Sequence, residues 1–460
     1  GKRMSSKGKE NKMGVMPVNQ LLLNMSLPMM GSMLVQALYN IVDSVFVAKL
    51  SENALTAVSL AFPIQTLLIA LGTGTGVGVN SLLSKQLGEG DLKQVSKTAM
   101  NGIFLAVMNF LVFVIVGIVG VRPFYASQVK GADPEIMSFG IQYLTIVCVC
   151  SFGLYAQLIF EKLLQSTGKT LYSMITQGVG AVINIFLDPV LIFGLFGMPK
   201  LGVAGAAIAT VIGQIVGGML GFAFNIKANK EITLSVKGFR PDGNTIANIY
   251  KVGVPAIIMQ AIGSVMTYGM NMILITFSST ATAVFGVYFK LQSFFFMPVF
   301  GLNNGLIPIV AYNYGAGKRS RLVKAIKCSL VYAFMLLFVG FIVFETVPAT
   351  LLGMFEASDE MLAIGVPALH IIGIHFLAAW FCIIAGSVFQ ALGNGVYSLV
   401  VSVARQLVVL LPVAYILARL GGLNAVWWAF PIAEVMSLCV SALFMIRIYK
   451  KVISKVPDNL

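Results

Sequence analysis

The chain has 460 residues, of which 58% are hydrophobic and only 10% are charged, and its formal net charge is +14. Soluble globular domains carry charges at about a quarter of their positions, so this composition excludes an ordinary soluble fold. It indicates an all-α, polytopic membrane protein. The basic residues gather in short loops rather than in one patch, so we expect the lipid bilayer, and no nucleic acid, as a partner.

Twelve apolar stretches follow one another along the chain. Each is long enough to cross a hydrocarbon core about 30 Å thick as a helix. The expected membrane-spanning helices are 20–48, 54–83, 97–120, 136–160, 168–196, 203–226, 248–277, 281–311, 324–348, 360–388, 396–419 and 424–448.

The two halves of the chain repeat each other at an interval of 227 residues. The glycines of GTGVGVNSLLSKQLGEGD reappear in GLNNGLIPIVAYNYGAGK, which takes Gly74, Gly78, Gly88 and Gly90 to Gly301, Gly305, Gly315 and Gly317. Because the boundary falls after six spans, both halves enter the membrane from the same side, as a parallel-topology repeat with a site between two lobes. We expect an N-lobe at 20–226 and a C-lobe at 248–449, with a linker at 227–247 and tails at 1–19 and 450–460.

The loop charges predict the orientation of the spans. With a cytoplasmic N-terminus, most lysines and arginines fall in the two tails and in the loops on the cytoplasmic side. The exceptions on the outer side are Lys49, Arg122, Lys130, Lys200 and Arg419. This positive-inside pattern predicts a multi-pass plasma-membrane protein with both termini in the cytoplasm.

Two patterns resemble sites without the context that a site needs. The glycine run from Gly72 to Gly78 has no strand before it, and Gly74 and Gly78 share one helical face, so we interpret it as close helix packing. His370 and His375 have no third ligand nearby, so we expect core or pore-lining histidines rather than a metal site. No catalytic constellation occurs, and we expect neither an enzyme nor a cofactor.

Polar stripes run along the first and fifth spans. The first stripe is spaced i, i+3, i+4 and i+7, and consists of Gln36, Tyr39, Asn40 and Asp43. The second consists of Gln177, Asn184 and Asp188. Both spans run outward, so Asp43 and Asp188 lie at similar depth and are expected to face one cavity. The alternative, that each aspartate caps a helix end or satisfies nearby backbone, stays open.

A carboxylate buried in a membrane costs several kcal/mol unless it is paired, solvated or neutralised. Protonation is the cheapest solution, and the same oxygens, with Asn184 and a hydroxyl, suit Na⁺. Either ion would allow one cavity to exchange a cation for a substrate. Pro189 deprives the Ile185 carbonyl of its helical partner, so we expect Pro189, and Pro28 in the first span, to act as hinges.

The second half lacks these acids. Met270 stands at the position of Asp43 under the shift of 227 residues, and Val413 stands at that of Asp188 under the shift of 225 residues that relates QSTGKTLYS at 165–173 to QALGNGVYS at 390–398. It carries three charges near mid-membrane instead, for which we predict a network that locks three spans or binds an anionic group. These are Lys290, Arg405 and Glu434. Met270, Tyr288 and Gln292 are expected to line the substrate cavity.

Twelve spans in two like-oriented sets, with LGEGD at 87–91 and YGAGK at 314–318, resemble the multidrug and toxic compound extrusion (MATE) family. The segments at 184–194 (NIFLDPVLIFG) and 202–213 (GVAGAAIATVIG) are similar to that family's motifs. The resemblance implies a V-shaped pair of lobes and alternating-access export of amphipathic, often cationic, compounds in exchange for inward H⁺ or Na⁺. It implies a cation site at Asp43, Asn184 and Asp188, with Thr210 as a weaker match, in a chamber lined by Gln36, Tyr39 and Tyr143.

The pattern is closer to the DinF-like branch than to the sodium-coupled NorM branch, which keeps a Glu on helix 7 and an Asp on helix 10. Here these helices offer Gln260 and two histidines, which favours coupling in the N-lobe. We expect a monomer. Three alternatives stay open: a flippase in which Lys290 and Arg405 hold a pyrophosphate, an exporter of one endogenous metabolite, and a membrane enzyme or receptor.

Overall fold

The computed structural model describes residues 11–128, 134–355 and 357–459. Most of the expected tail at 1–19, and Lys130, lie outside the described residues. The described chain consists of helices and short connections and contains no β-strand, which confirms the all-α prediction.

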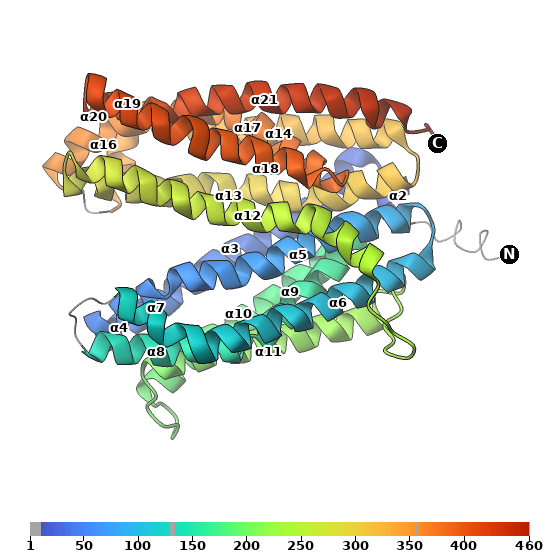
Figure 1. Ribbon diagram of the computed structural model, residues 1–460, viewed down its shortest axis with the longest axis horizontal. Coiled ribbons are helices and arrows are strands. Elements are labelled where there is room, and N and C mark those ends of the chain that lie inside the picture. The colour runs from blue at the N-terminus through green and yellow to red at the C-terminus, as the bar shows by residue number, and fades with distance from the viewer. Residues whose placement is uncertain (1–10, 129–133, 356, 460) are drawn as a thin grey trace. The chain divides into compact units, whose positions relative to one another are not determined.

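The helices of the first half correspond to the first six expected spans (Figure 1). They are α2 (Lys12–Val15), α3 (Val18–Leu50), α4 (Glu52–Leu60), α5 (Phe62–Gly88), α6 (Leu92–Ile115), the π-helix η1 (Val116–Gly120), α7 (Val121–Gln128), α8 (Pro134–Val149), α9 (Phe152–Ser166), α10 (Thr170–Phe193) and α11 (Val203–Lys227).

The second half is built in the same way. It contains α12 (Gly243–Ile275), α13 (Ser279–Gly315), α14 (Arg319–Thr346), α15 (Pro348–Gly353), α16 (Asp359–Ile372), the 3₁₀-helix η2 (Gly373–His375), α17 (Phe376–Ala391), α18 (Gly395–Val403), the π-helix η3 (Ala404–Leu410), α19 (Leu411–Gly421), α20 (Leu423–Val426), α21 (Ala429–Lys451) and the 3₁₀-helix η4 (Ile453–Lys455).

Within the described residues, 11 helices are long and apolar enough to cross a membrane, and a twelfth span results if α8 and α9 count as one. These two helices meet at 46° inside the expected span 136–160. The bend lies next to Gly153, where an added Cβ would come within 2.8 Å of the backbone nitrogen of Ile215. The close approach of α11 thus fixes the start of α9.

Repeated residues end and begin equivalent helices in the two halves. The Ser51 hydroxyl accepts a hydrogen bond from the Ala54 amide ahead of α4, and the Ser278 hydroxyl does the same for Ala281 ahead of α13. Gly90 and Gly317 both have positive φ, at 78° and 68°. The last glycine of each repeated motif therefore serves a left-handed turn that favours glycine.

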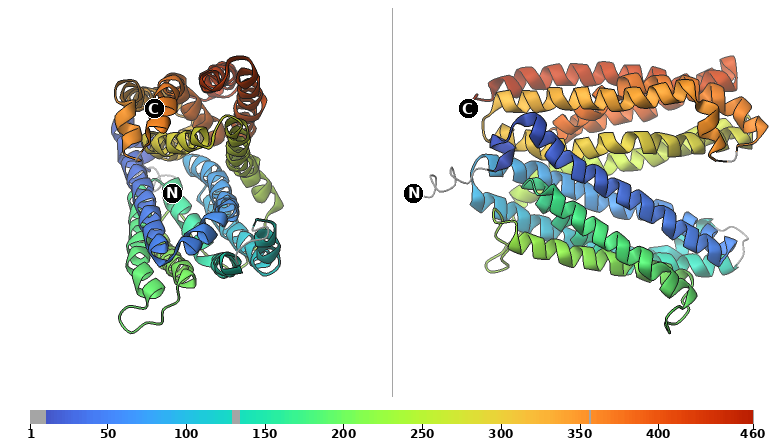
Figure 2. Two further views of the ribbon diagram at one scale, coloured as in Figure 1. Left: turned by 90° about the vertical axis from the view of Figure 1, so that its left-hand side faces the viewer. Right: turned by 180° about the vertical axis from the view of Figure 1, so that it is seen from behind.

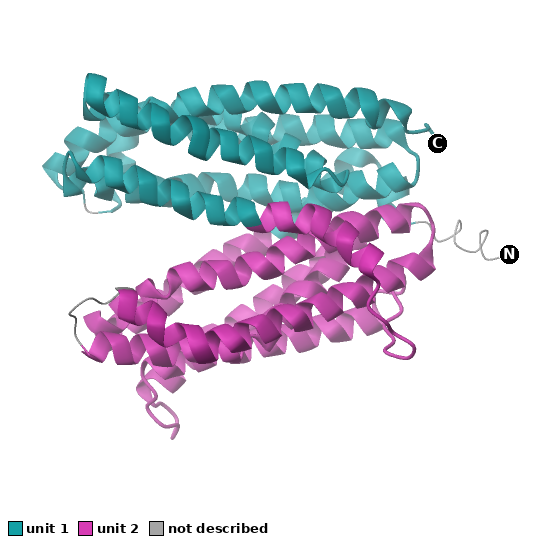
Figure 3. Cartoon of the chain, viewed as in Figure 1, with its two compact units in different colours: residues 1–30, 258–460 teal, residues 31–257 magenta. Residues whose placement is uncertain are grey.

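The described contacts divide the chain into two units, one formed by residues 1–30 and 258–460 and the other by residues 31–257 (Figure 3). Within each unit the long helices run roughly along one another (Figure 2). The divisions fall inside α3 and α12, and not at the expected lobe boundaries of 20–226 and 248–449. The first half of each of these helices therefore belongs to the unit that holds the other repeat.

The repeated glycines are the contact points of the exchanged half-helices. A Cβ on Gly78 would lie 2.1 Å from the carbonyl oxygen of Ile249 on α12. A Cβ on Gly305 would lie 3.0 Å from the Cα of Ser26 on α3. These contacts confirm close packing as the reason for the glycine run, because only glycine lets the backbones approach so closely.

Both described chain ends lie against the turn between α13 and α14. Arg321 donates from Nη2 to the carbonyl oxygens of Met13 and Met16. On the other side, the Asp458 carboxylate accepts a hydrogen bond from the Ser320 amide at 3.1 Å. The N-terminal and C-terminal segments therefore lie at one end of their unit.

Candidate functional site

Asp43 on α3 and Asp188 on α10 meet inside the unit formed by residues 31–257. Asp188 is fully buried, and a hydrogen bond joins the two carboxyl groups when one of them is protonated. With both groups ionised, Asp43 Oδ1 and the two oxygens of Asp188 have no hydrogen-bond donor among the described residues. Asp43 lies inside α3 and Asp188 lies inside α10, so neither is a cap residue, and the two carboxyl groups lie close together.

Two neutral oxygens lie next to the acid pair: the amide oxygen of Asn184 on α10 and the hydroxyl of Thr210 on α11. Asn184 donates from Nδ2 to the Thr210 hydroxyl at 3.4 Å, and that hydroxyl donates to the Ala206 carbonyl at 3.1 Å. Asn184 Oδ1 is buried and has no partner among the described residues. The structure thus brings Asn184 and Thr210 together one helical turn from Asp188.

Two glycines explain why α10 and α11 come so close. A Cβ on Gly180 would lie 2.9 Å from the carbonyl oxygen of Gly213, and a Cβ on Gly213 would lie 2.7 Å from that of Gly180. Without side chains at these positions, the two backbones pack directly against each other. This contact, one turn before Asn184, sets the distance between Asn184 and Thr210.

Aromatic side chains enclose the acids. Tyr39 and Tyr143 both lie near enough to Asp43 and Asp188 to interact with them electrostatically. Gln65 Nε2 donates to the Tyr143 hydroxyl at 3.0 Å. We did not predict Gln65 as a site residue, although its recurrence as Gln292 in the repeat was an available signal. The Gln36 and Asn40 side chains of the same stripe are exposed.

A chain of side-chain hydrogen bonds connects Gln177, in the polar stripe of α10, to Gln157 and Glu161 on α9. Gln157 donates from Nε2 to Gln177 Oε1 at 3.3 Å and to Glu161 Oε1 at 3.1 Å. Gln157 and Glu161 are buried, and sequence reasoning missed both of them. Their spacing of four residues in an apolar span was the signal. The α10 helix runs through Pro189 without interruption.

The charge network of the second half differs in membership from the prediction. Glu434 Oε2 lies 3.6 Å from Arg405 Nη1 and 3.6 Å from His375 Nδ1, while His375 Nε2 lies 2.7 Å from the Tyr288 hydroxyl. The ammonium of Lys290 lies 5.8 Å from the ring centroid of Phe355 instead. His375, which we expected to be a core or pore-lining residue, thus takes the place predicted for Lys290.

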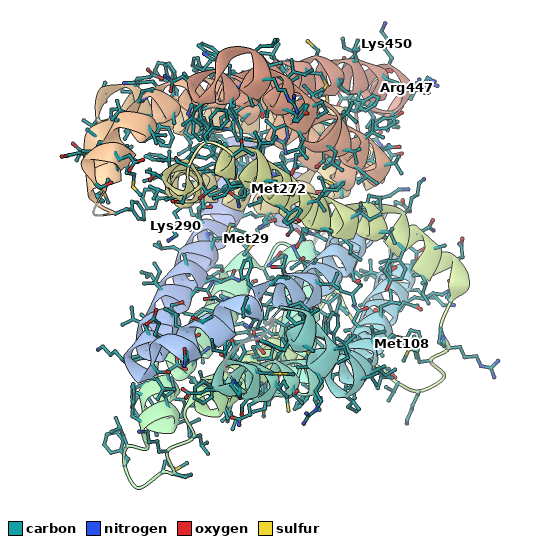
Figure 4. All side chains as sticks on the ribbon, turned by 60° about the vertical axis from the view of Figure 1, so that its left-hand side comes forward. Met29, Met108, Met272, Lys290, Arg447 and Lys450 are labelled. Atoms are coloured by element: carbon teal, nitrogen blue, oxygen red, sulfur yellow. The ribbon has the colours of Figure 1, made fainter. Side chains whose placement is uncertain are left out.

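The expected cavity residues of the second half separate into two environments. Met270 and Tyr288 are buried in the core, whereas Gln292 is partly exposed. A shallow pocket of about 550 Å³ opens between α12 and α13, and Met272 marks its position in Figure 4. Its lining consists of Tyr268, Asn271, Met272, Ile275, Thr282 and Ala283. Met270 is fully buried and is not part of this lining.

The donor set around the acid pair consists of carboxylate, amide and hydroxyl oxygens, which suits a proton or a hard monovalent cation. Among the described residues, no group of three or more His, Cys, Asp or Glu side chains could hold a metal ion. Arg447 and Lys450, labelled in Figure 4, project from the last turns of α21.

Comparison with known proteins gives consistent matches over nearly the whole chain. The sequence model of the MatE family matches residues 28–190 and 255–416. The chain is 27% identical over 440 residues to the multidrug export protein MepA of Staphylococcus aureus strain MRSA252, covering 94% of this chain and 93% of MepA. MepA of Staphylococcus haemolyticus strain JCSC1435 is 27% identical over 416 residues, or 90% of each chain.

Solved structures share the fold. One is a multidrug resistance MATE family transporter of the MOP superfamily in an outward-facing conformation, with a TM-score of 0.89 at 24% identity, covering 97% of this chain and 99% of that chain. Another is a MOP superfamily transporter from Pyrococcus furiosus, with a TM-score of 0.88 at 24% identity, covering 96% and 98%.

Proposed function

Because the chain belongs to the MatE family, whose relatives here are multidrug exporters, we propose that it is a secondary active transporter that expels amphipathic, often cationic, organic compounds in exchange for inward H⁺ or Na⁺. The exchange proceeds by alternating access in the plasma membrane, with both termini in the cytoplasm. Coupling takes place at Asp43 and Asp188, as in the DinF-like branch rather than the NorM branch.

A single observation carries this proposal: four buried oxygens of Asp43, Asp188 and Asn184 lack a hydrogen-bond donor among the described residues. An unsatisfied buried carboxylate costs several kcal/mol, so the site needs a proton or a cation. A proton between the two carboxyl groups supplies the missing donor, and Na⁺ among the same oxygens, with Thr210, supplies the missing charge. The site is thus suited to load and release a monovalent cation.

The exporter is favoured over a lipid-linked flippase by the placement of the two interior bases. Arg405 faces Glu434, whereas Lys290 lies over Phe355. A pyrophosphate site would gather both bases around one anion. The acid pair instead provides a negative site that attracts organic cations.

Reconstitution in liposomes tests the proposal directly. Efflux of a cationic dye is measured under a proton gradient alone and under a sodium gradient alone. One of the two gradients should drive efflux by the native protein, and Asp43→Asn and Asp188→Asn should each abolish it. Glu52→Gln, which removes an exposed acid from the start of α4, is the matched control and should retain efflux. Gradient-driven efflux by either aspartate variant would disprove coupling at the pair.

A further inference from the structure

Glu434 in the second half faces two bases through one oxygen. Its Oε2 lies 3.6 Å from both Arg405 Nη1 and His375 Nδ1, and its Oε1 is buried without a hydrogen-bond partner among the described residues. One carboxylate needs only one positive charge to be neutralised. The cluster therefore holds one more basic group than its charge balance requires.

Arg405 and His375 differ in how freely each side chain can move away from Glu434. The side chains of His375 and Glu434 are 6% and 5% exposed, whereas that of Arg405 is 31% exposed. Arg405 also lies in η3, a π-helical stretch, and such irregular turns are frequent at functional sites. Arg405 is thus the base that can turn away from Glu434, while His375 cannot.

The ring nitrogens of His375 have polar partners whether the imidazole is neutral or protonated. Its Nε2 lies 2.7 Å from the Tyr288 hydroxyl, which donates to a neutral ring nitrogen and accepts from a protonated one. Its Nδ1 faces Glu434, so an added proton creates an ion pair rather than an isolated charge. Imidazole is also the side chain that ordinarily changes charge near neutral pH.

The geometry points to a proton-linked anion site in the second half: a carboxylate on a bound compound draws Arg405 away from Glu434, and His375 takes up a proton that keeps Glu434 paired. The proton comes from solution and returns to it when the carboxylate leaves. The ligand class is an amphipathic compound that carries a carboxylate. This inference rests on the proposed transport function only for its choice of ligands.

The other titratable groups near His375 do not supply the same charge. Glu345 Oε2 is already 3.0 Å from His370 Nδ1, and Cys382 contacts the Ser437 hydroxyl at 3.3 Å. The groups that interact with the cluster are Tyr288 from α13, Cys382 from α17, Arg405 from η3 and Glu434 from α21. Glu345 from α14 and His370 from α16, two elements that also pack against η2, pair with each other. Within the described residues, His375 is the only group that both contacts Glu434 and can become positively charged by taking up a proton.

The chain contains only two histidines, which makes the test direct. Protein labelled with ¹⁵N-histidine is placed in nanodiscs at constant pH near 7, and the His375 signals are assigned from their loss in His375→Gln. An amphipathic carboxylate-bearing dye should shift the His375 signals toward the imidazolium position, and its methyl ester should not. His370, which pairs with Glu345, is the internal control and should not respond to the difference.

Arg405→Gln provides the second arm. Removing the guanidinium should leave His375 protonated without any ligand, and the carboxylate dye should cause no further change. Asp43→Asn should abolish transport and leave the His375 response intact, which separates this inference from the proposed function. A His375 signal that stays neutral in Arg405→Gln, or that responds equally to dye and ester, would overturn the site.

Discussion

The buried oxygens of Asp43 and Asp188 that lack a hydrogen-bond donor can bind an ion, but they lower the stability of the fold. Asp188 is fully buried beside Asp43, and when both groups are ionised no described residue donates a hydrogen bond to either oxygen of Asp188. An asparagine at position 188 has nearly the same shape and would add a donor while removing a charge. Binding sites of this kind trade folding free energy for function.

We therefore predict that Asp188→Asn raises the midpoint of thermal unfolding while it abolishes coupling. Replacing the buried charge by an amide that donates toward Asp43 should stabilise the fold by about 1–2 kcal/mol. The measurement is thermal unfolding of purified protein in detergent at pH 8, where an unloaded pair is most costly. Asn184→Asp, which adds a third carboxyl group, should lower the midpoint; a lower midpoint in Asp188→Asn would contradict the argument.

At the scale of single helices, glycines that touch a neighbour differ from glycines that touch nothing. Both kinds occur in α10. A Cβ on Gly180 would lie 2.9 Å from the Gly213 carbonyl oxygen, whereas a Cβ on Gly178 meets nothing within 4 Å. We therefore expect the same substitution to have different effects at these two positions.

Gly180→Ala should destabilise the protein by about 1–3 kcal/mol, because the added methyl group forces α10 away from α11. It should also weaken the Asn184–Thr210 contact and so reduce gradient-driven dye efflux. Gly178→Ala should be neutral or stabilise by about 0.5–1 kcal/mol, since alanine is the better helix former. Thermal unfolding and efflux assays of the two variants check both outcomes, and equal effects would show that the helix contact does not matter.

The helices and the acid pair were predictable because their signals are local. Helical spacing placed Asp43 and Asp188 on polar faces, and the repeat identified Gly74 and Gly78 as contact residues. The partners of Glu434 were not predictable in this way. Which spans neighbour each other decides whether His375 or Lys290 reaches that carboxylate, and a long side chain such as lysine can extend to a distant loop residue such as Phe355.

At the scale of the whole chain, the segment between α11 and α12 is tied to its own unit by polar contacts. Lys97 Nζ lies 3.0 Å from Asp242 Oδ2, and the Asn101 side chain accepts from the Asp242 amide at 3.0 Å. A hydrogen bond from Thr245, assisted by Lys97, lowers the pKa of Asp242 to about 2. The carboxylate is thus ionised and paired at neutral pH.

A lowered carboxyl pKa contributes stability that is present above the ordinary value near 4 and is lost as the pH falls through the native value. We therefore predict that residues 228–242 become more accessible to protease as the pH drops from about 4 toward 2. Limited proteolysis with an acid-active protease measures this. Asp242→Asn should be cleaved faster at pH 5, where the native carboxylate is still charged; equal cleavage rates at pH 5 would exclude this tether.

The exchange of half-helices has a further consequence for how the two repeats are held together. Residues 18–30 pack in the same unit as residues 258–460, and residues 243–257 pack in the same unit as residues 31–257. Each repeat therefore contributes one helical segment to the unit that holds most of the other repeat. This is the topology of a domain-swapped dimer whose two subunits have been fused. When the backbone is severed between positions 235 and 236, the two polypeptides should still co-purify when they are expressed together. The exchanged helical segments, rather than the peptide bond between the repeats, should keep them associated.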